Sequence, residues 1–183
     1  MGKLIASTQA TLDGVIDPVG EWVQPGGDHA EYSFERQARS SGLVLGRKTY
    51  EGLAAVWPQL TDDPTLGRYA DRINSMPKYV ASRSLREPLE WNATLLEGDL
   101  AQSVAAIKER HQGDLIVSGA GELAHALLGL GLVDELWFWV SPYLWPASPR
   151  IFDGVGPVRL ELIGSTTFAS GVLRLAYRPA SGS

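Results

Sequence analysis

Short apolar runs bounded by turn residues alternate with helix-length segments along most of this sequence. Two parallel strands cannot be joined by a tight turn and need a crossover of about a dozen or more residues, usually a helix. The pattern therefore predicts an α/β fold with a mostly parallel sheet and helices on both faces. The apolar runs cover residues 3–8, 42–45, 78–82, 94–96, 115–118 and 135–141, and helices are expected at 28–39, 47–56, 66–73, 100–110 and after Gly121.

The C-terminal part has a different pattern, in which apolar and polar residues alternate. Ser170 and Gly171 separate two such stretches, which predicts an antiparallel β-hairpin with one solvent-exposed face. The hairpin must join one side of the parallel sheet, so the expected sheet is mixed. The apolar positions of the hairpin are Val158, Leu160, Leu162, Leu173, Leu175 and Tyr177.

Length and composition favour one domain. The 183 residues, 44% of them hydrophobic, suffice for one substantial core and are short for two. We expect a single domain over residues 1–178 and a flexible tail over 179–183. The chain has no cysteine, which excludes disulfides and thiolate metal sites, and it has no apolar run of membrane-spanning length. A formal net charge of −5 argues against nucleic acid as a partner, and the cytoplasm is the expected compartment.

One junction between an apolar run and a helix has the composition of an anion site. Gly46 ends the run at 42–45, and Arg47, Lys48 and Thr49 open the following helix. Free N–H groups at a helix start attract anions, whereas cations there are intrinsically unfavourable. A bound anion would remove that cost, so we interpret the junction as a phosphate site.

Two further junctions support a ligand with more than one phosphate. Gly119, Ala120, Gly121 and Glu122 follow the run at 115–118 and precede a helix. A Gly-x-Gly turn alone is weak, but this position between a strand and a well-patterned helix favours a cofactor site. The third junction carries Ser82 and Arg83, although a salt bridge would explain the arginine equally well.

The order and spacing of several motifs resemble the dihydrofolate-reductase-like superfamily. The resemblance is closest to the C-terminal reductase domain of the bifunctional riboflavin-biosynthesis deaminase/reductase and its stand-alone bacterial relatives. It covers nearly the whole chain and implies a mixed, mostly parallel central sheet with a C-terminal antiparallel hairpin. The motifs are Leu12-Asp13-Gly14, Leu45-Gly46-Arg47-Lys48-Thr49-Tyr50, Tyr79-Val80-Ala81-Ser82-Arg83, Ser118-Gly119-Ala120-Gly121-Glu122-Leu123, Gly131-Leu132-Val133-Asp134-Glu135-Leu136 and Phe152-Asp153-Gly154.

This resemblance implies a reductase that binds NADPH along the carboxyl edge of the sheet. The loop containing Leu12, Asp13 and Gly14 would then cover the nicotinamide, although an aspartate before a glycine also closes turns by itself. The cofactor residues implied are Gly46, Arg47, Lys48 and Thr49 for the phosphates, Ser82 and Arg83 for the adenosine 2′-phosphate, and Gly119, Ala120, Gly121 and Glu122 for the pyrophosphate.

The substrate end is less closely matched. Members of the family usually have a Gly-x-Gly pair where this chain has Pro146-Ala147-Ser148-Pro149, so this region is expected to be remodelled. Dihydrofolate reductases place a carboxylate on the helix after the first loop. By spacing from Gly46, Glu31 is the nearest candidate for a proton donor and Asp28 is its neighbour.

The expected function is hydride transfer from NADPH to a C=N or C=O group of a small heterocyclic or sugar-linked substrate. The alternatives are a nucleotide sensor without turnover and a dihydrofolate reductase. The histidines His29, His111 and His125 share no metal-ligand spacing, so no metal site is predicted, and each is expected on a loop or exposed helix face. Trp137 and Trp139 share one side of a strand, which fits either core packing or a homodimer interface.

Overall fold

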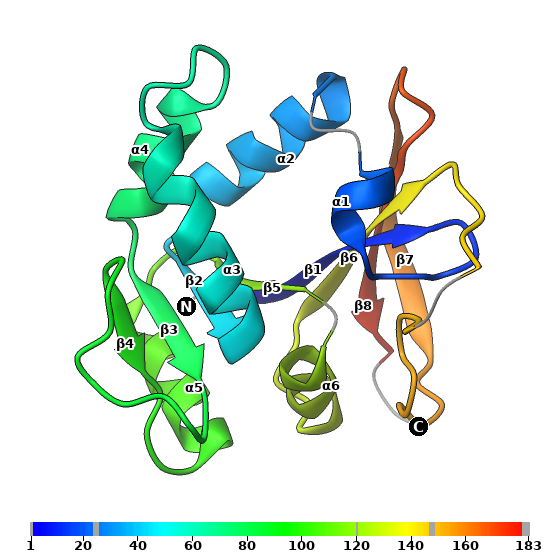
Figure 1. Cartoon of the computed structure of the whole chain (residues 1–183). Helices are drawn as coiled ribbons and strands as arrows, with labels where there is room; N and C mark the ends of the chain where they lie inside the picture. Colours follow the sequence, from blue (N-terminus) through cyan, green and yellow to red (C-terminus); the bar gives the residue numbers. More distant parts are fainter. Residues whose placement is uncertain (1, 24–25, 120, 147–148, 181–183) are drawn as a thin grey trace.

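A central β-sheet organises the computed structural model, which describes residues 2–23, 26–119, 121–146 and 149–180 (Figure 1). Its strands are β1 (Leu4–Thr11), β2 (Gly42–Gly46), β3 (Lys78–Ala81), β4 (Ala93–Leu95), β5 (Leu115–Ser118), β6 (Glu135–Ser141), β7 (Leu160–Thr167) and β8 (Leu173–Pro179). In the described residues they form one sheet in the order β4-β3-β2-β5-β1-β6-β8-β7. Neighbours from β4 to β6 are parallel, and β8 is antiparallel to both β6 and β7. The predicted mixed sheet is confirmed.

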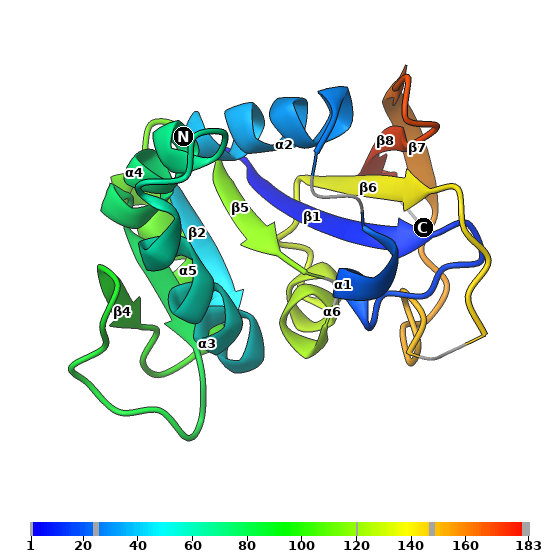
Figure 2. The same cartoon turned by 45° about the horizontal axis from the view of Figure 1, so that its top comes forward.

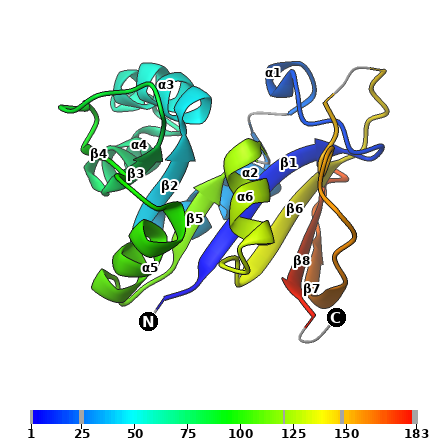
Figure 3. The same cartoon turned by 90° about the horizontal axis from the view of Figure 1, so that it is seen from below.

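Helices cover both faces of this sheet, as the alternation of runs predicts. The helices are α1 (Val19–Trp22), α2 (Asp28–Ala38), α3 (Arg47–Val56), η1 (Trp57–Leu60), α4 (Gly67–Ser75), α5 (Leu100–Arg110) and α6 (Glu122–Gly129). Helices α2, α3 and α4 lie on one face, whereas α5 and α6 lie on the other, in front of the sheet in Figure 3. No helix in the described part of the chain is long and apolar enough to cross a membrane.

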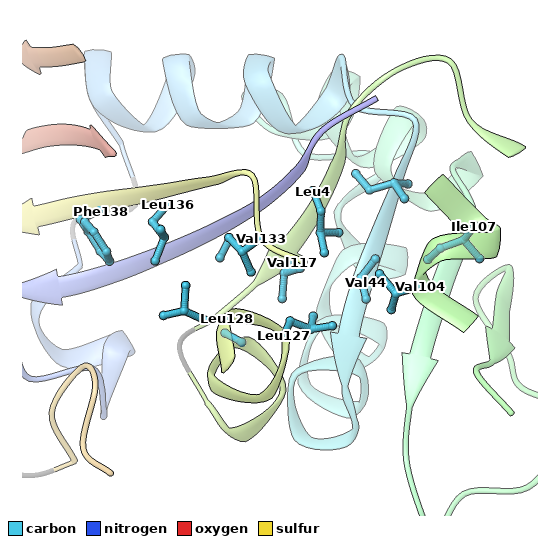
Figure 4. Close-up of a cluster of buried hydrophobic side chains, with 13 residues drawn as sticks. Leu4, Val44, Val104, Ile107, Val117, Leu127, Leu128, Val133, Leu136 and Phe138 are labelled. Atoms are coloured by element: carbon cyan, nitrogen blue, oxygen red, sulfur yellow. The ribbon is translucent and has the colours of Figure 1, made fainter. Parts of the chain in front are cut away.

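Each parallel strand supplies apolar side chains to both faces, because a buried strand alternates sides at every residue. On β2, Val44 joins the cluster beneath α5 and α6, while Leu43 and Leu45 join the cluster beneath α3 and α4. Figure 4 shows the first cluster, in which Leu127 and Leu128 point from α6 toward the sheet. This face is closely packed with aliphatic and aromatic side chains.

The C-terminal hairpin forms, with differences at its edge. A β-bulge between Leu162 and Gly164 shifts the register of β7 against β8. Leu162 is 58% exposed and Val158 is 44% exposed, so the prediction that these two side chains face inward is wrong. The reason is that β7 is the outermost strand, beyond the reach of α5 and α6 (Figure 3).

The predicted tail begins too early. Pro179 still pairs with Leu160 in the hairpin, and the N–H of Ala180 donates to the carbonyl of Arg159 at 2.9 Å. Residues 181–183 lie outside the described residues.

Candidate active site

Helices α3 and α6 begin side by side at the carboxyl edge of the sheet, where β2 and β5 end (Figure 2). A Cβ added to Gly119 would lie 3.5 Å from Oγ1 of Thr49, and one added to Gly46 would lie 3.8 Å from Cβ of Leu123. The two glycine-marked junctions of the sequence are therefore adjacent in space. This is the edge at which open α/β sheets bind ligands.

Neither helix start has a side-chain cap. Gly46 is the N-cap of α3 and Gly121 is that of α6, and no side chain accepts a hydrogen bond from the first N–H groups. At Gly121 the backbone φ is −84° and an added Cβ would meet nothing within 4 Å, so other residues would fit. The first N–H groups of both helices are thus left for solvent or a ligand, and the dipoles favour an anion there.

At Gly119, in contrast, the backbone conformation favours glycine. Its φ of +94° lies in the left-handed region, where a side chain would be strained. Ala120 lies outside the described residues, and Glu122 is the exposed first residue of α6. The strand-to-helix turn therefore brings bare backbone toward the start of α3.

The basic residues of the sequence motifs are distributed along this edge. Arg47 forms an i,i+4 pair with Glu51 at 3.7 Å, whereas Lys48 and Thr49 line a cleft beside the helix starts. Arg83 is exposed at the end of β3, next to β2 in the sheet. Ser82 holds this turn, since its Oγ accepts from the N–H groups of the residues at 84 and 85 at 3.2 and 3.1 Å. Neither Ser82 nor Arg83 lines the cleft.

The cleft has a volume of about 770 Å³ and lies between α2, the start of α3 and side chains of β1, β5 and β6. Its walls combine aromatic and polar side chains, as ligand pockets commonly do. The aromatic members are Phe34, Trp57, Trp137 and Trp139, and the polar ones include Ser7, Gln9, Asp17, His29, Ser33, Arg36, Gln37, Lys48, Thr49 and Ser118. Trp137 and Trp139 are 4% and 2% exposed, so they belong to this interior wall and form no outer interface.

The two carboxylates expected to donate a proton do not line the cleft. Glu31 is ion-paired with Arg68 and its side chain is 58% exposed. The carboxylate of Asp28 accepts hydrogen bonds at 2.9 Å from the backbone N–H groups of Ala169 and His29, and these bonds, that of Ala169 first, lower its pKa. Asp28 therefore stays ionised and ties α2 to the hairpin turn.

His29, which follows Asp28 on the same helix, does line the cleft. It is 3% exposed, lines the cleft and packs edge-on against Phe168, contrary to the expected surface position. Its Nδ1 lies 2.9 Å from Oγ of Ser170. The hairpin turn thus fixes the ring while the residue remains on the cleft wall.

The first loop is anchored to the segment after β6. Asp13 accepts a hydrogen bond from the hydroxyl of Thr11 at 2.6 Å and lies 3.5 Å from Arg150, and the Thr11 bond is the main cause of its lowered pKa. The N–H of Ile16 donates to the carbonyl of Pro149 at 3.1 Å. Ile16 and Asp17, rather than Leu12, Asp13 and Gly14, line the cleft. Of the unusual segment 146–149, residues 147–148 lie outside the described residues.

The sequence matches the family described as RibD C-terminal domain over residues 2–174. The chain belongs to this family. The family is reductase-like, and its fold is the dihydrofolate-reductase-like fold that the motifs indicate.

Individual proteins are similar to this chain in sequence or in fold. The sequence is 26% identical over 179 residues to the uncharacterized protein YyaP of Bacillus subtilis (strain 168), covering 96% of this chain and 94% of YyaP. A Thermotoga maritima diaminohydroxyphosphoribosylaminopyrimidine deaminase/5-amino-6-(5-phosphoribosylamino)uracil reductase shares the fold, with a TM-score of 0.69, 18% identity and coverage of 98% of this chain and 57% of that chain. Dihydrofolate reductase from Enterococcus faecalis, solved with NADP(H), has a TM-score of 0.63 and 17% identity over 98% of each chain.

Sequence reasoning missed the polar stripe of α2 in this RibD C-terminal domain. His29, Ser33, Arg36 and Gln37 recur at helical spacing and all line the cleft. The same helix carries an apolar stripe of Ala30, Phe34 and Ala38, which is the more obvious pattern in its sequence. A helix that covers a hollow can bury both stripes, and the spacing of the polar residues was the available signal.

His125 is buried in part, although it was expected to face solvent. Its ring stacks on Phe152 with centroids 6.4 Å apart, and its Nε2 is buried without a partner in the described residues. The covering loop comes from a distant part of the chain, which the helical pattern of α6 could not reveal. Among the described residues, no group of three potential ligands is placed to hold a metal ion.

Proposed function

We propose that this RibD C-terminal domain is an NADPH-dependent reductase that transfers a hydride to a C=N or C=O carbon of a small heterocyclic or sugar-linked substrate. The observation that carries the proposal is the pair of uncapped helix starts, α3 and α6, at the mouth of a cleft of about 770 Å³. That volume lies within the range of small-molecule sites. The family and the NADP(H)-bound dihydrofolate reductase of the same fold support the choice of cofactor.

The residues of the carboxyl edge fit a dinucleotide phosphate chain. The open N–H groups after Gly46 and Gly121 would bind the pyrophosphate, with Lys48 and Thr49 beside them. Arg83, one strand further along the edge, is the proposed partner of the adenosine 2′-phosphate. When bound, NADPH supplies the hydride. The protein supplies the position and the charges.

His29 is the proposed proton donor, in place of Glu31 and Asp28. As the hydride forms the new C–H bond, the π electrons of the C=N or C=O bond move to nitrogen or oxygen, which must then gain a proton. His29 is the one imidazole on the described wall of the cleft, and Ser170 holds its Nδ1. A protonated ring can donate from Nε2 to the substrate, directly or through a water molecule. Asp17, the one carboxylate among the described lining residues, lies at an exposed position.

Nucleotide titration tests the proposal. NADPH and NADH are added separately while tryptophan emission is followed, since Trp57, Trp137 and Trp139 line the cleft. We expect NADPH to bind more tightly, and Arg83→Ala to reduce its advantage over NADH by about tenfold, the value of one charge-assisted bond. Arg86→Ala, an exposed arginine of the same turn, is the matched control and should leave the ratio unchanged.

Two outcomes would contradict parts of this account. Emission and melting temperature unmoved by either nucleotide would remove the reductase proposal. NADPH that binds but is never oxidised with a panel of aldehydes, imines and pterins would favour the alternative of a nucleotide sensor. Folate reduction is the least favoured activity, because the described cleft wall presents no carboxylate from α2.

We also propose that the chain forms a homodimer through its hairpin edge. Leu162 and Ile163 on β7 are 58% and 43% exposed. An exposed apolar edge strand is a common place for association. Sedimentation velocity should show a dimer that Leu162→Lys dissociates, and a monomeric wild type would contradict the proposal.

A further inference from the structure

A small pocket, here called the α6 pocket, lies beneath α6 on the face of the sheet opposite the cleft. On β6, Leu136 and Phe138 line it, whereas Trp137 between them lines the cleft, because neighbouring residues of a strand face opposite sides. Figure 4 shows Leu136 and Phe138 on this face, with Leu128 of α6 across from them. The α6 pocket also has walls from β1 and from residues 151–152, and its volume of about 20 Å³ holds one water molecule but no ring.

One polar atom in the wall of the α6 pocket has no partner. Nε2 of His125 is buried and makes no hydrogen bond within the described residues. His125 lines the α6 pocket and not the cleft. Thr8 is the other polar side chain on the described wall, and its hydroxyl donates to the carbonyl of Gln9 at 3.3 Å. A buried imidazole nitrogen without a partner is costly to the fold, so a polar group that entered the pocket beside it would be stabilised.

Phe152 closes the α6 pocket in a strained conformation. Its φ is +68°, in the left-handed region that bulky side chains rarely adopt. The ring stacks on His125 with centroids 6.4 Å apart and packs edge-on against Phe138 at 5.5 Å. Strain of this kind persists only where the surrounding contacts enforce it, and it is frequent at ligand clamps. The contacts of the Phe152 ring thus offset a backbone cost that a separate molecule in the same place would not carry.

The backbone on either side of Phe152 has attachments of its own. The N–H of Ile151 donates to the carbonyl of Gly14 at 2.7 Å, which ties this segment to the first loop. The N–H of Arg150 donates to the carboxylate of Asp153 at 2.9 Å. Neither bond involves Phe152. Its ring can therefore leave the α6 pocket while the segment stays attached to the first loop.

The space that the Phe152 ring fills defines the molecule that could replace it. A flat ring fits, because the Phe152 ring lies at only 29° to the ring of His125, and the neighbouring side chains of Ala124, Leu128 and Leu136 are apolar. The described wall has no carboxylate, ammonium or guanidinium group, so a charged molecule would lose its hydration without compensation. A hydroxyl group both donates and accepts, so it can pair with Nε2 in either tautomer of His125.

We propose that the α6 pocket is a second binding site, which takes a small neutral aromatic ring with one hydroxyl group. The ring of this ligand replaces that of Phe152, and its hydroxyl hydrogen-bonds to Nε2 of His125. Binding gains the missing hydrogen bond and releases the strain at residue 152. The site uses neither the starts of α3 and α6 nor the side chains of α2, so it goes beyond the proposed function and does not depend on it.

The test compares phenol with toluene, which has the same shape and carries a methyl group in place of the hydroxyl. Each is titrated without nucleotide, and binding is followed in ¹H–¹⁵N spectra. We expect phenol to bind wild type about tenfold more tightly than toluene and to shift the amide signals of Ala124 and Leu136. His125→Leu should bind the two equally, whereas His111→Leu, the matched control at the amino end of the sheet, should keep the preference. Phe152→Gly should bind phenol about tenfold more tightly than wild type, because no ring competes and glycine adopts a positive φ freely.

Three outcomes would overturn the inference. Equal affinity of wild type for phenol and toluene would show that Nε2 of His125 does not recognise the ligand. Shifts confined to amides of the cleft wall, such as those of Ser33 and Gln37, would place phenol in the cleft. Binding to Phe152→Gly without binding to wild type would mean an engineered cavity only. If His125→Leu fails to fold, the phenol and toluene affinities of wild type and Phe152→Gly decide. Absence of NADPH binding beside an intact phenol preference would contradict the proposed function alone.

Discussion

Polar groups at the amino ends of the parallel strands are hydrogen-bonded to one another, whereas two helix starts at the carboxyl ends have no side-chain partner. At the amino end, the carboxylate of Asp134 accepts from the N–H of Leu4 and from Nζ of Lys108, both at 2.6 Å. Lys3 pairs there with Glu135 at 2.5 Å. At the carboxyl end, the helix starts at Gly46 and Gly121 have no side-chain cap.

The amino end of the sheet therefore contributes to stability, and the carboxyl end is available for function. Hydrogen bonds and ion pairs among the polar groups at the amino end hold the strand starts together. At the carboxyl end, α3 and α6 begin without a side-chain cap, as a site for an external anion requires. Changes at the amino end should therefore alter unfolding, and changes at the carboxyl end should alter binding.

The largest expected effect concerns a buried lysine at the amino end. Lys78 is the first residue of β3 and is 0% exposed; its Nζ donates to the carbonyl of Asn74 at 2.8 Å and lies 4.1 Å from the ring centroid of Trp91. Burial, with a smaller contribution from the charge of Arg72, lowers its pKa from 10.5 to about 8. Between these values the unfolded chain holds a proton that the folded protein has released. The free energy of unfolding should therefore rise with pH from about 8 to 10.5, by up to about 3 kcal/mol.

Urea unfolding at a series of pH values measures this rise. Below pH 8 both states carry the charge, so the burial cost is present in full and stability is lowest with respect to this group. Lys78→Met should remove the rise, whereas Lys48→Met, at an exposed position, should retain it. Tyr50 and Tyr79, whose pKa values are raised by burial, titrate in every variant and cancel in the comparison. A wild type whose stability follows the same course as Lys78→Met would show that the ammonium is not buried in solution.

Two histidines, one at each end of the sheet, test whether catalysis depends on the carboxyl end alone. His29 lies on the cleft wall, whereas His111 follows α5 at the amino end, where its Nε2 lies 2.8 Å from the hydroxyl of Tyr79. If His29 delivers the proton, His29→Gln should slow NADPH oxidation by about 100-fold, the lower range for general acid catalysis, without changing NADPH affinity. His111→Gln should leave the rate unchanged. Stopped-flow absorbance of NADPH with any active substrate of the panel gives both numbers, and equal rates in the two variants would exclude His29 as the donor.

Local signals in the sequence were sufficient for most of the fold. The bounds expected for β6 and α5 are those observed, because a run buried on both faces and a helix behind Asp99 are encoded by neighbouring residues. The adjacency of the α3 and α6 starts depends on β5 lying next to β2, a strand order that local patterns do not encode. The positions of His29 and His125 did not follow, because each depends on a segment far away in the chain, near Ser170 and Phe152 respectively.

The remaining prediction concerns two helix starts at the carboxyl end, one with a side-chain cap and one without. Helix α5 begins there after β4, and the carboxylate of Asp99 accepts from the N–H of Gln102 at 3.0 Å. Gly121 holds the same place before α6 with no side chain, although its backbone would accept one. Gly121→Asp should therefore cap α6 and keep or raise the melting temperature, while its carboxylate repels the phosphates and weakens NADPH binding by tenfold or more.

Asp99→Ala should remove the cap of α5. We expect it to lower the unfolding free energy by about 1 kcal/mol and to leave NADPH affinity unchanged. Measuring both quantities for both variants makes each the control for the other. If Gly121→Asp bound NADPH as wild type does, the start of α6 would not be a phosphate site, and glycine at 121 would have no role in binding. If Asp99→Ala weakened NADPH binding, the cofactor would reach further along the edge than β3, and the capped start of α5 would belong to the site as well.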